Sequence, residues 1–210
     1  MPHDPLVLRR ASAHLKRADP VLANIIAAVG PCRLQVDRGG GPFASLAEAI
    51  LYQQITGKAA ASIHRRLCAL VGRKHPRPQD ILAATAEQLR EVGLSRQKIR
   101  YLRDLSEKAL DGLPLAGLGR LPDEKVITTL TAVMGIGRWT AEIYLMFRLG
   151  RLDVLPVDDY GVRKAMQRAY RMRALPKPDR MRRVAEPWRP YRTVASWYLW
   201  KSIDGAAAFE

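Results

Sequence analysis

Cysteine is scarce in this 210-residue sequence, and long apolar runs are absent from it. The two cysteines, Cys32 and Cys68, cannot supply a four-thiolate metal site and do not mark a disulfide framework. No apolar run approaches the roughly 18–20 residues of a membrane span. The N-terminus does not read as a secretion signal, because its short apolar stretch precedes its basic residues. We therefore expect a cytoplasmic protein with no membrane partner.

Acidic residues are few compared with basic ones. Lys and Arg total 35 and Asp and Glu total 20, which gives a net charge of +15. Between Arg163 and Lys201 there are twelve basic residues and two acidic ones. A field of this sign attracts polyanions, so the composition favours a nucleic-acid partner. The alternatives are an ordinary solvated basic face and an RNA- or ribosome-bound protein.

The sequence offers almost no strand pattern, and helix signals run along most of it. Asp19-Pro20 is a typical helix start, and Gly30-Pro31 a typical stop. Capping-box patterns at Ser45–Glu48 and Thr85–Gln88 predict two more helix starts, the first opening a long helix to about residue 70. Ser95 and Pro122 open others, and a further helix follows from residue 162. The expected fold class is all-α, with nine or ten short helices.

The stretch from Leu130 to Ala141 reads LTAVMGIGRWTA and is the most informative in the chain. One helix is expected to end before Gly135 and another to begin near Arg138. The paired glycines allow a tight turn, and the second helix presents free N–H groups and its positive dipole end. Such a hairpin suits a DNA phosphate. A plain helix–turn–helix corner is the alternative. The expected contacts are Gly135, Ile136, Gly137, Arg138 and Thr140.

Two adjacent aspartates, Asp158 and Asp159, precede the helix from residue 162. Asp is a preferred N-cap residue, so one of the two needs no other role. The following motifs are similar, in order and type, to the helix-hairpin-helix DNA glycosylase superfamily, and most similar to its 3-methyladenine DNA glycosylase II (AlkA) type: AILYQQ at 49–54, GLSRQK at 93–98, the hairpin, PVDD at 156–159 and WRPYR at 188–192.

The resemblance implies that Asp159, twenty positions after Trp139, is the catalytic carboxylate, and that Asp158 is a neighbour with a capping role. Breaking an N-glycosidic bond places positive charge on the sugar, and a carboxylate in a dry pocket stabilises that charge. It can also orient the attacking water. The implied activity is a monofunctional glycosylase that removes alkylated purines from double-stranded DNA.

The resemblance also implies the absence of lyase activity and of cofactors. Relatives that nick the backbone carry a lysine where this chain has Trp139, so no amine is available there for a Schiff base. Relatives with an iron–sulfur cluster carry four cysteines near the C-terminus, and this chain has none after Cys68. We expect no cofactor, apart from a Na⁺ or K⁺ ion that the resemblance would place on the hairpin carbonyls of Thr131, Val133 and Ile136.

The family's base pocket implies roles for Trp139, Trp200, Tyr160 and Gln53, since a cationic alkylpurine stacks on an indole by cation–π attraction. Gln54 is expected at the tip of a loop that enters the minor groove, which requires a turn near residues 52–57. The best-known relative has a leucine wedge there, and glutamine departs from it. Lys98, Arg163 and Lys164 are expected phosphate contacts; solvated surface charges are the alternative.

The expected architecture is one compact catalytic unit, residues 1–210, with two helical lobes around a basic DNA-binding cleft. One lobe covers residues 41–155 and the other 1–40 plus 156–210, without the β-rich N-terminal domain of the best-known relative. We expect a nucleoid-associated monomer. Two alternatives stay open: a glycosylase for another lesion, such as hypoxanthine or ethenoadenine, and a non-catalytic helix-hairpin-helix module that binds DNA.

Overall fold

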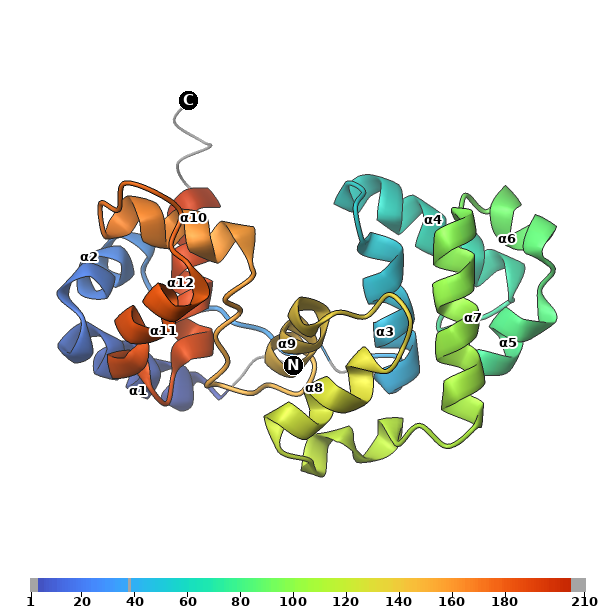
Figure 1. Cartoon of the computed structure of the whole chain (residues 1–210), viewed down its shortest axis with the longest axis horizontal. Helices are drawn as coiled ribbons and strands as arrows, with labels where there is room; N and C mark the ends of the chain where they lie inside the picture. The colour runs from blue at the N-terminus through green and yellow to red at the C-terminus, as the bar shows by residue number, and fades with distance from the viewer. Residues whose placement is uncertain (1–3, 38, 205–210) are drawn as a thin grey trace. The chain divides into compact units, whose positions relative to one another are not determined.

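The computed structural model describes residues 4–37 and 39–204, and helices make up most of these ranges (Figure 1). The all-α prediction is confirmed, because these residues contain no β-strand. They form twelve α-helices and two 3₁₀ helices: α1 Pro5–Ala18, α2 Pro20–Val29, α3 Gly41–Tyr52, α4 Gly57–Leu70, α5 Pro78–Ala83, α6 Ala86–Glu91, α7 Arg96–Leu110, η1 Leu115–Arg120, α8 Asp123–Thr131, α9 Arg138–Phe147, α10 Tyr160–Ala169, α11 Pro178–Val184, η2 Glu186–Trp188 and α12 Arg192–Asp204. The expectation of nine or ten was too low, partly because several helices span only six or seven residues.

The chain divides into two compact units. The terminal unit combines residues 1–37 with residues 142–210, and the central unit is the continuous segment 38–141. The sequence led us to place the boundaries at 40/41 and 155/156, whereas contacts place them at 37/38 and, within α9, at 141/142. None of the helices in the described residues is long and apolar enough to cross a membrane.

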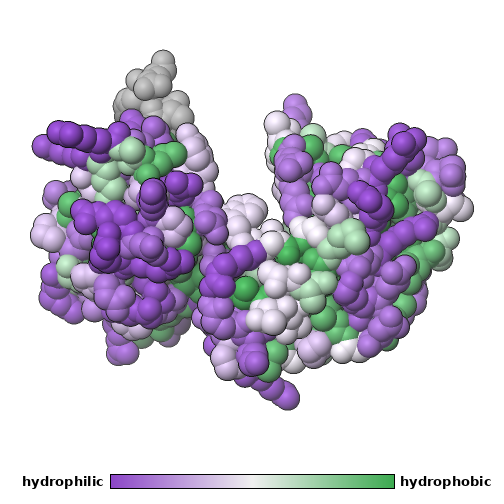
Figure 2. All heavy atoms as spheres, in the orientation of Figure 1, coloured by the Kyte–Doolittle hydropathy of each residue, from purple (hydrophilic) through white to green (hydrophobic). Residues whose placement is uncertain are grey.

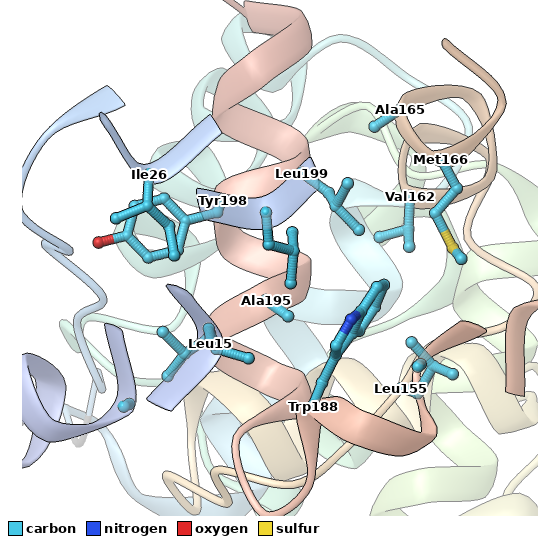
Figure 3. Packing of buried hydrophobic residues seen from close by; sticks show 14 of the residues in the cluster. Leu15, Ile26, Leu155, Val162, Ala165, Met166, Trp188, Ala195, Tyr198 and Leu199 are labelled. Atoms are coloured by element: carbon cyan, nitrogen blue, oxygen red, sulfur yellow. The ribbon is translucent and has the colours of Figure 1, made fainter. Parts of the chain in front are cut away.

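The core of the terminal unit is built from both ends of the chain. Trp188 and Tyr198, each fully buried, lie among Leu15 and Ile26 from the N-terminal helices and Met166 from α10 (Figure 3). α12 packs against α2 and α10, so one helix joins the early and late segments. On the visible face of this unit, hydrophilic side chains gather in the region of α11 (Figure 2), in line with the many basic residues of the sequence there.

One buried carboxylate, Asp19, links three parts of the terminal unit. Its Oδ1 caps α2 by accepting hydrogen bonds from the backbone N–H groups of Val21 and Leu22, at 2.8 and 3.2 Å. Its Oδ2 accepts from the hydroxyl of Tyr170, just after α10, at 2.5 Å and from the indole N–H of Trp188 at 2.8 Å. The predicted Asp19-Pro20 helix start is therefore confirmed, and the same side chain also satisfies a buried indole.

The central unit packs around α7, whose buried residues Ile99, Leu102 and Leu105 repeat at helical spacing. This helix packs against α3 and α5. Ser95 and Thr85 are the N-caps of α7 and α6, and Thr85 forms a capping box with Gln88, as their sequence patterns predicted.

The predicted capping box at Ser45 is wrong. Ser45 is buried within α3, and its hydroxyl donates to the carbonyl of Gly41, one turn earlier, at 2.7 Å. The helix begins at Gly41 because Pro42, in its first turn, has no N–H to lose and a φ angle already suited to a helix. A Ser-x-x-Glu pattern inside an apolar helix therefore predicted the right element with an N-cap five residues too late.

The turn expected near residues 52–57 is present. α3 ends at Tyr52 and α4 begins at Gly57, so the long helix is two helices. Thr56 caps α4 by accepting from the backbone N–H of Ala59 at 3.3 Å. Gln54 has a φ of +57°, a conformation that side-chain-bearing residues rarely adopt. This turn presents Gln53 and Gln54 outside regular helix.

Candidate functional site

Asp159 is a buried carboxylate at the start of a helix. It is the N-cap of α10, and its side chain is only 8% exposed. Its Oδ1 accepts a hydrogen bond from the backbone N–H of Val162 at 2.7 Å and a second from the indole N–H of Trp200 at 2.8 Å. The positive end of the α10 dipole and these two N–H donors surround the carboxylate on the side of the helix. The acid expected to be catalytic is therefore held in place and shielded from bulk water.

Asp158 does not have the capping role that was expected of it. Asp158 is exposed, and Asp159 caps α10 instead. The backbone explains the choice, because the N–H of Asp159 closes a turn onto the carbonyl of Pro156 at 3.0 Å and leaves Asp159 extended just before the helix. One residue thus combines the cap with the position of the candidate catalytic group.

Trp200 lies against the carboxylate from α12. Its ring is 5.8 Å from that of Phe147 between centroids, with a 34° tilt. Gly161 adjoins both groups: a Cβ atom there would lie 3.0 Å from the Trp200 indole and 3.1 Å from Asp159 Oδ1. Tyr160, the first residue of α10, is 66% exposed. Of the predicted residues, the terminal unit therefore brings Asp159 and Trp200 into contact and leaves the Tyr160 side chain largely in solvent.

The glycine hairpin connects α8 to α9 through residues 132–137, as predicted. Gly135 has a φ of +82°, and a Cβ atom at this position would lie 2.1 Å from the ring of Tyr101. Both the backbone conformation and the close approach of the ring therefore require glycine. The side chain of Ile136 is buried, so this residue faces the protein core and offers a ligand only its backbone.

Two charged contacts brace the hairpin. The carboxylate of Asp104, on α7, accepts from the backbone N–H of Met134 at 2.7 Å and pairs with Lys108. These hydrogen bonds outweigh burial and lower the pKa of Asp104. Arg138, expected to contact phosphate, forms two hydrogen bonds with Glu124 on α8, at 2.5 and 3.1 Å. No sequence signal pointed to Asp104, because it lies 30 residues before Met134.

A cavity of about 420 Å³ lies in the central unit, beside the hairpin. The cavity is lined by six of the site residues predicted from the sequence: Gln53, Gln54, Lys98, Gly135, Trp139 and Thr140. Tyr52 and Tyr101, which the sequence did not nominate, are also part of its wall. Trp139 is 42% exposed and Thr140 only 8%, so the indole is the accessible group of this pair.

Two of these residues are tied to backbone carbonyls. The side-chain amide of Gln53 donates to the carbonyl of Gly135 at 2.9 Å, which links the turn after α3 to the hairpin. The ammonium of Lys98 donates to the carbonyl of Leu51 at 2.5 Å, where it also meets the negative end of the α3 dipole. Burial lowers the pKa of Lys98. The roles predicted for them, in the base pocket and at a phosphate, stay predictions.

The remaining predicted contacts are in the terminal unit. Arg163 donates through Nε to the carbonyl of Pro176 at 3.2 Å, and Lys164 donates to the side chain of Gln167 at 3.2 Å.

The predicted cation site lies in the central unit, where Thr131, Val133 and Ile136 line one recess at the hairpin together with Asp104 and Lys108. Carbonyl oxygens suit a monovalent cation, and the predicted ion stays a prediction. The described residues hold no group of three His, Cys, Asp or Glu side chains suited to a metal.

Comparisons with known proteins identify the family of the chain. Residues 47–190 match the model of the HhH-GPD superfamily base excision DNA repair proteins. The chain is 33% identical to DNA-3-methyladenine glycosylase 1 of Schizosaccharomyces pombe, over 93% of this chain and 87% of that protein. It is 30% identical to the alkylbase DNA glycosidase-like protein mag2 of the same yeast, over 92% of each.

Solved structures give the same result. A Schizosaccharomyces pombe 3-methyladenine DNA glycosylase in complex with abasic DNA matches with a TM-score of 0.81 and 32% identity, covering 93% of this chain and 97% of that one. A DNA-3-methyladenine glycosidase from Bacillus halodurans matches with a TM-score of 0.81 and 35% identity, covering 93% and 89%. The chain belongs to the HhH-GPD superfamily of base excision DNA repair proteins.

Proposed function

We propose that this protein is a monofunctional DNA glycosylase that hydrolyses the N-glycosidic bond of alkylated purines in double-stranded DNA. The observation that carries the proposal is Asp159, a buried carboxylate held by two N–H donors at the N-terminus of α10. The names of the similar proteins, 3-methyladenine DNA glycosylases and an alkylbase glycosidase-like protein, support the substrate class.

The chemistry suits a single carboxylate. An alkylated purine such as 3-methyladenine or 7-methylguanine carries a positive charge, so it leaves readily when the bond between C1′ and the base nitrogen breaks. The electron pair of that bond goes to the base, which becomes neutral, and the positive charge passes to the sugar. The Asp159 carboxylate stabilises this sugar cation, and water then adds at C1′ and releases a proton.

Recognition of the base is assigned to Trp139. Its indole is an exposed aromatic side chain of the 420 Å³ cavity, at 42% against 38% for Tyr52, and its electron-rich face attracts a cationic purine with about 0.5–2 kcal/mol. The base must first leave the helix stack, which costs a few kcal/mol. A normal neutral base lacks the cation–π attraction, and its glycosidic bond is stronger than that of an alkylated base. Both effects favour damaged bases.

DNA binding is assigned to the hairpin and to the overall charge of +15. Arg138 pairs with Glu124 at the surface, so the phosphate contact is assigned first to the backbone N–H groups at the start of α9. Such contacts are independent of sequence, as an enzyme that searches for rare lesions requires. Trp139 stands where a lyase would need a lysine, so we expect free base and an intact backbone as products.

The test is release of free base from methylated DNA by the wild type and by Asp159→Asn. Asparagine can keep the cap and accept from Trp200 but lacks the charge. We expect the rate of release of 3-methyladenine and 7-methylguanine to fall by at least about 100-fold. Asp158, the exposed neighbour of Asp159, provides the matched control, and Asp158→Asn should retain full activity.

Equal release by the wild type and Asp159→Asn would overturn the assignment. DNA binding by the wild type without release of any base would favour a non-catalytic module. Release of hypoxanthine or ethenoadenine, but not of methylated purines, from defined duplexes would show a different lesion class.

A further inference from the structure

We propose that Trp200 is a positioning residue that fixes the orientation of the Asp159 carboxylate, through a contact for which Gly161 leaves the space. This inference rests on the proposed function, because it assigns Trp200 a part in the same reaction. The sequence suggested that Trp200 is a wall of the base pocket, and this inference gives its side chain a different role.

The first argument is the pair of hydrogen bonds on one oxygen. Oδ1 of Asp159 receives the backbone N–H of Val162 at 2.7 Å and the indole N–H of Trp200 at 2.8 Å. The first donor belongs to the backbone of α10 and the second to a side chain of α12, so they approach from different elements. Rotation of the carboxylate about its Cβ–Cγ bond would move Oδ1 away from both. The two bonds together therefore select one orientation, whereas the N-cap bond alone fixes one contact.

The second argument is how tightly the indole fits. A Cβ atom at Gly161 would lie 3.0 Å from both Cδ1 and Nε1 of Trp200 and 3.1 Å from Asp159 Oδ1. These are closer than ordinary van der Waals contacts and involve the same atoms that make the hydrogen bond. Alanine is a better helix former than glycine, so the helix by itself does not explain glycine here. The space that glycine leaves is the space that the indole and the carboxylate use.

The third argument is that the indole is itself held. Its ring packs against Phe147 with 5.8 Å between centroids, and α12 packs directly against α10. A donor on a restrained ring orients its acceptor better than one on a mobile side chain, because less rotational freedom remains to be lost.

The experiment compares Trp200→Phe with Trp197→Phe, a matched change on the same helix that leaves the Asp159 contact intact. Phenylalanine keeps an aromatic ring that can stack on a base and on Phe147 but removes the N–H donor. We expect the single-turnover rate of base release to fall about 10- to 100-fold, the range for loss of one hydrogen bond to a charged group. Binding to a duplex with an uncleavable tetrahydrofuran abasic analogue should change less than about threefold. Trp197→Phe should change neither quantity.

Gly161→Ala provides a second variant that does not depend on the fate of the tryptophan mutant. Its methyl group should displace the indole or the carboxylate and lower the rate at least about tenfold, while the thermal unfolding midpoint stays within a few degrees of the wild type. Gly117→Ala is its control, because a Cβ atom there meets nothing within 4 Å.

The outcomes separate this inference from the proposed function. If the wild type releases no base, both fail together. If the wild type is active and either Trp200→Phe or Gly161→Ala releases base within about twofold of its rate, only the positioning role fails. The positioning role would also be overturned if Trp200→Phe lost DNA affinity by the same factor as it lost rate. That result would indicate that Trp200 contributes to binding of the substrate instead.

Discussion

Replacing Asp19 by alanine should destabilise the terminal unit far more than the loss of a helix cap. The side chain is only 8% exposed and accepts hydrogen bonds from four donors. Two are the backbone N–H groups that begin α2. The others are the hydroxyl of Tyr170 and the indole N–H of Trp188, a fully buried residue. One substitution therefore removes an N-cap and leaves a buried donor without its acceptor.

The magnitude follows from these separate losses. Removing an Asp N-cap costs about 1 kcal/mol. The buried N–H of Trp188 then lacks a partner, at about 1–3 kcal/mol, and the loss of the Tyr170 hydrogen bond adds about 1 kcal/mol. Together we expect the free energy of unfolding to fall by about 3–5 kcal/mol, a large part of the roughly 5–15 kcal/mol that stabilises a typical domain.

Urea unfolding followed by far-ultraviolet circular dichroism measures this loss, provided that the slope of free energy with urea stays constant. The chain contains its own control. Asp4 precedes Pro5 as Asp19 precedes Pro20, and it caps α1 by accepting from the N–H of Leu6 at 2.8 Å, but it is exposed. Asp4→Ala should therefore cost about 1 kcal/mol or less. Equal effects of the two substitutions would refute the reasoning, because the buried partners of Asp19 would then contribute nothing.

Two further predictions concern a titration and a turn. Burial, with the hydrogen bond and charge of Asp19, raises the pKa of Tyr170 above the value of about 10 that it has in the unfolded chain. The contribution of this hydroxyl to the free energy of unfolding is thus complete below about pH 10 and declines as the pH rises further. Tyr170→Phe should therefore make the free energy of unfolding fall less steeply at alkaline pH, by up to about 1.4 kcal/mol per pH unit. An unchanged slope would contradict this prediction. Gly135→Ala should cost about 2–4 kcal/mol, because its Cβ would lie 2.1 Å from the Tyr101 ring in a backbone with φ of +82°. Gly137→Ala, whose Cβ meets nothing within 4 Å, should be nearly neutral in the same urea assay, and comparable losses would count against the steric argument.

Helix starts with a local chemical signature could be predicted from the sequence. The caps at Asp19, Thr85 and Ser95 each depend on a side chain that bonds a backbone N–H two or three residues later. Such contacts depend only on a few consecutive residues, so they can be predicted from the sequence. Ser45 failed for a related reason, since its hydroxyl had a backbone carbonyl within reach one turn back and did not need to cap. A local pattern predicts a possible bond, and burial decides which one forms.

The candidate site divides in the same way. The hairpin and Asp159 could be predicted because their residues are nearly contiguous and their order resembles a family. The donor from Trp200 could not, because it comes from 41 residues beyond Asp159 and depends on how α12 packs. Likewise, neither the hydrogen bond from the Met134 N–H to Asp104 nor that from the Gln53 amide to the Gly135 carbonyl has a local signature. Contacts set by tertiary packing leave no trace in spacing alone.

The terminal unit assembles from the two ends of the chain, whereas the central unit is continuous. During synthesis the central segment can therefore complete its contacts while α10 to α12 are still untranslated. Until those helices leave the ribosome, Leu15, Leu22 and Ile26 of α1 and α2 lack their core partners from η2 and α12, among them Trp188 and Tyr198. Exposed apolar surface of this kind promotes aggregation. The nascent chain thus has to keep its first two helices from associating with other chains until its last helix arrives.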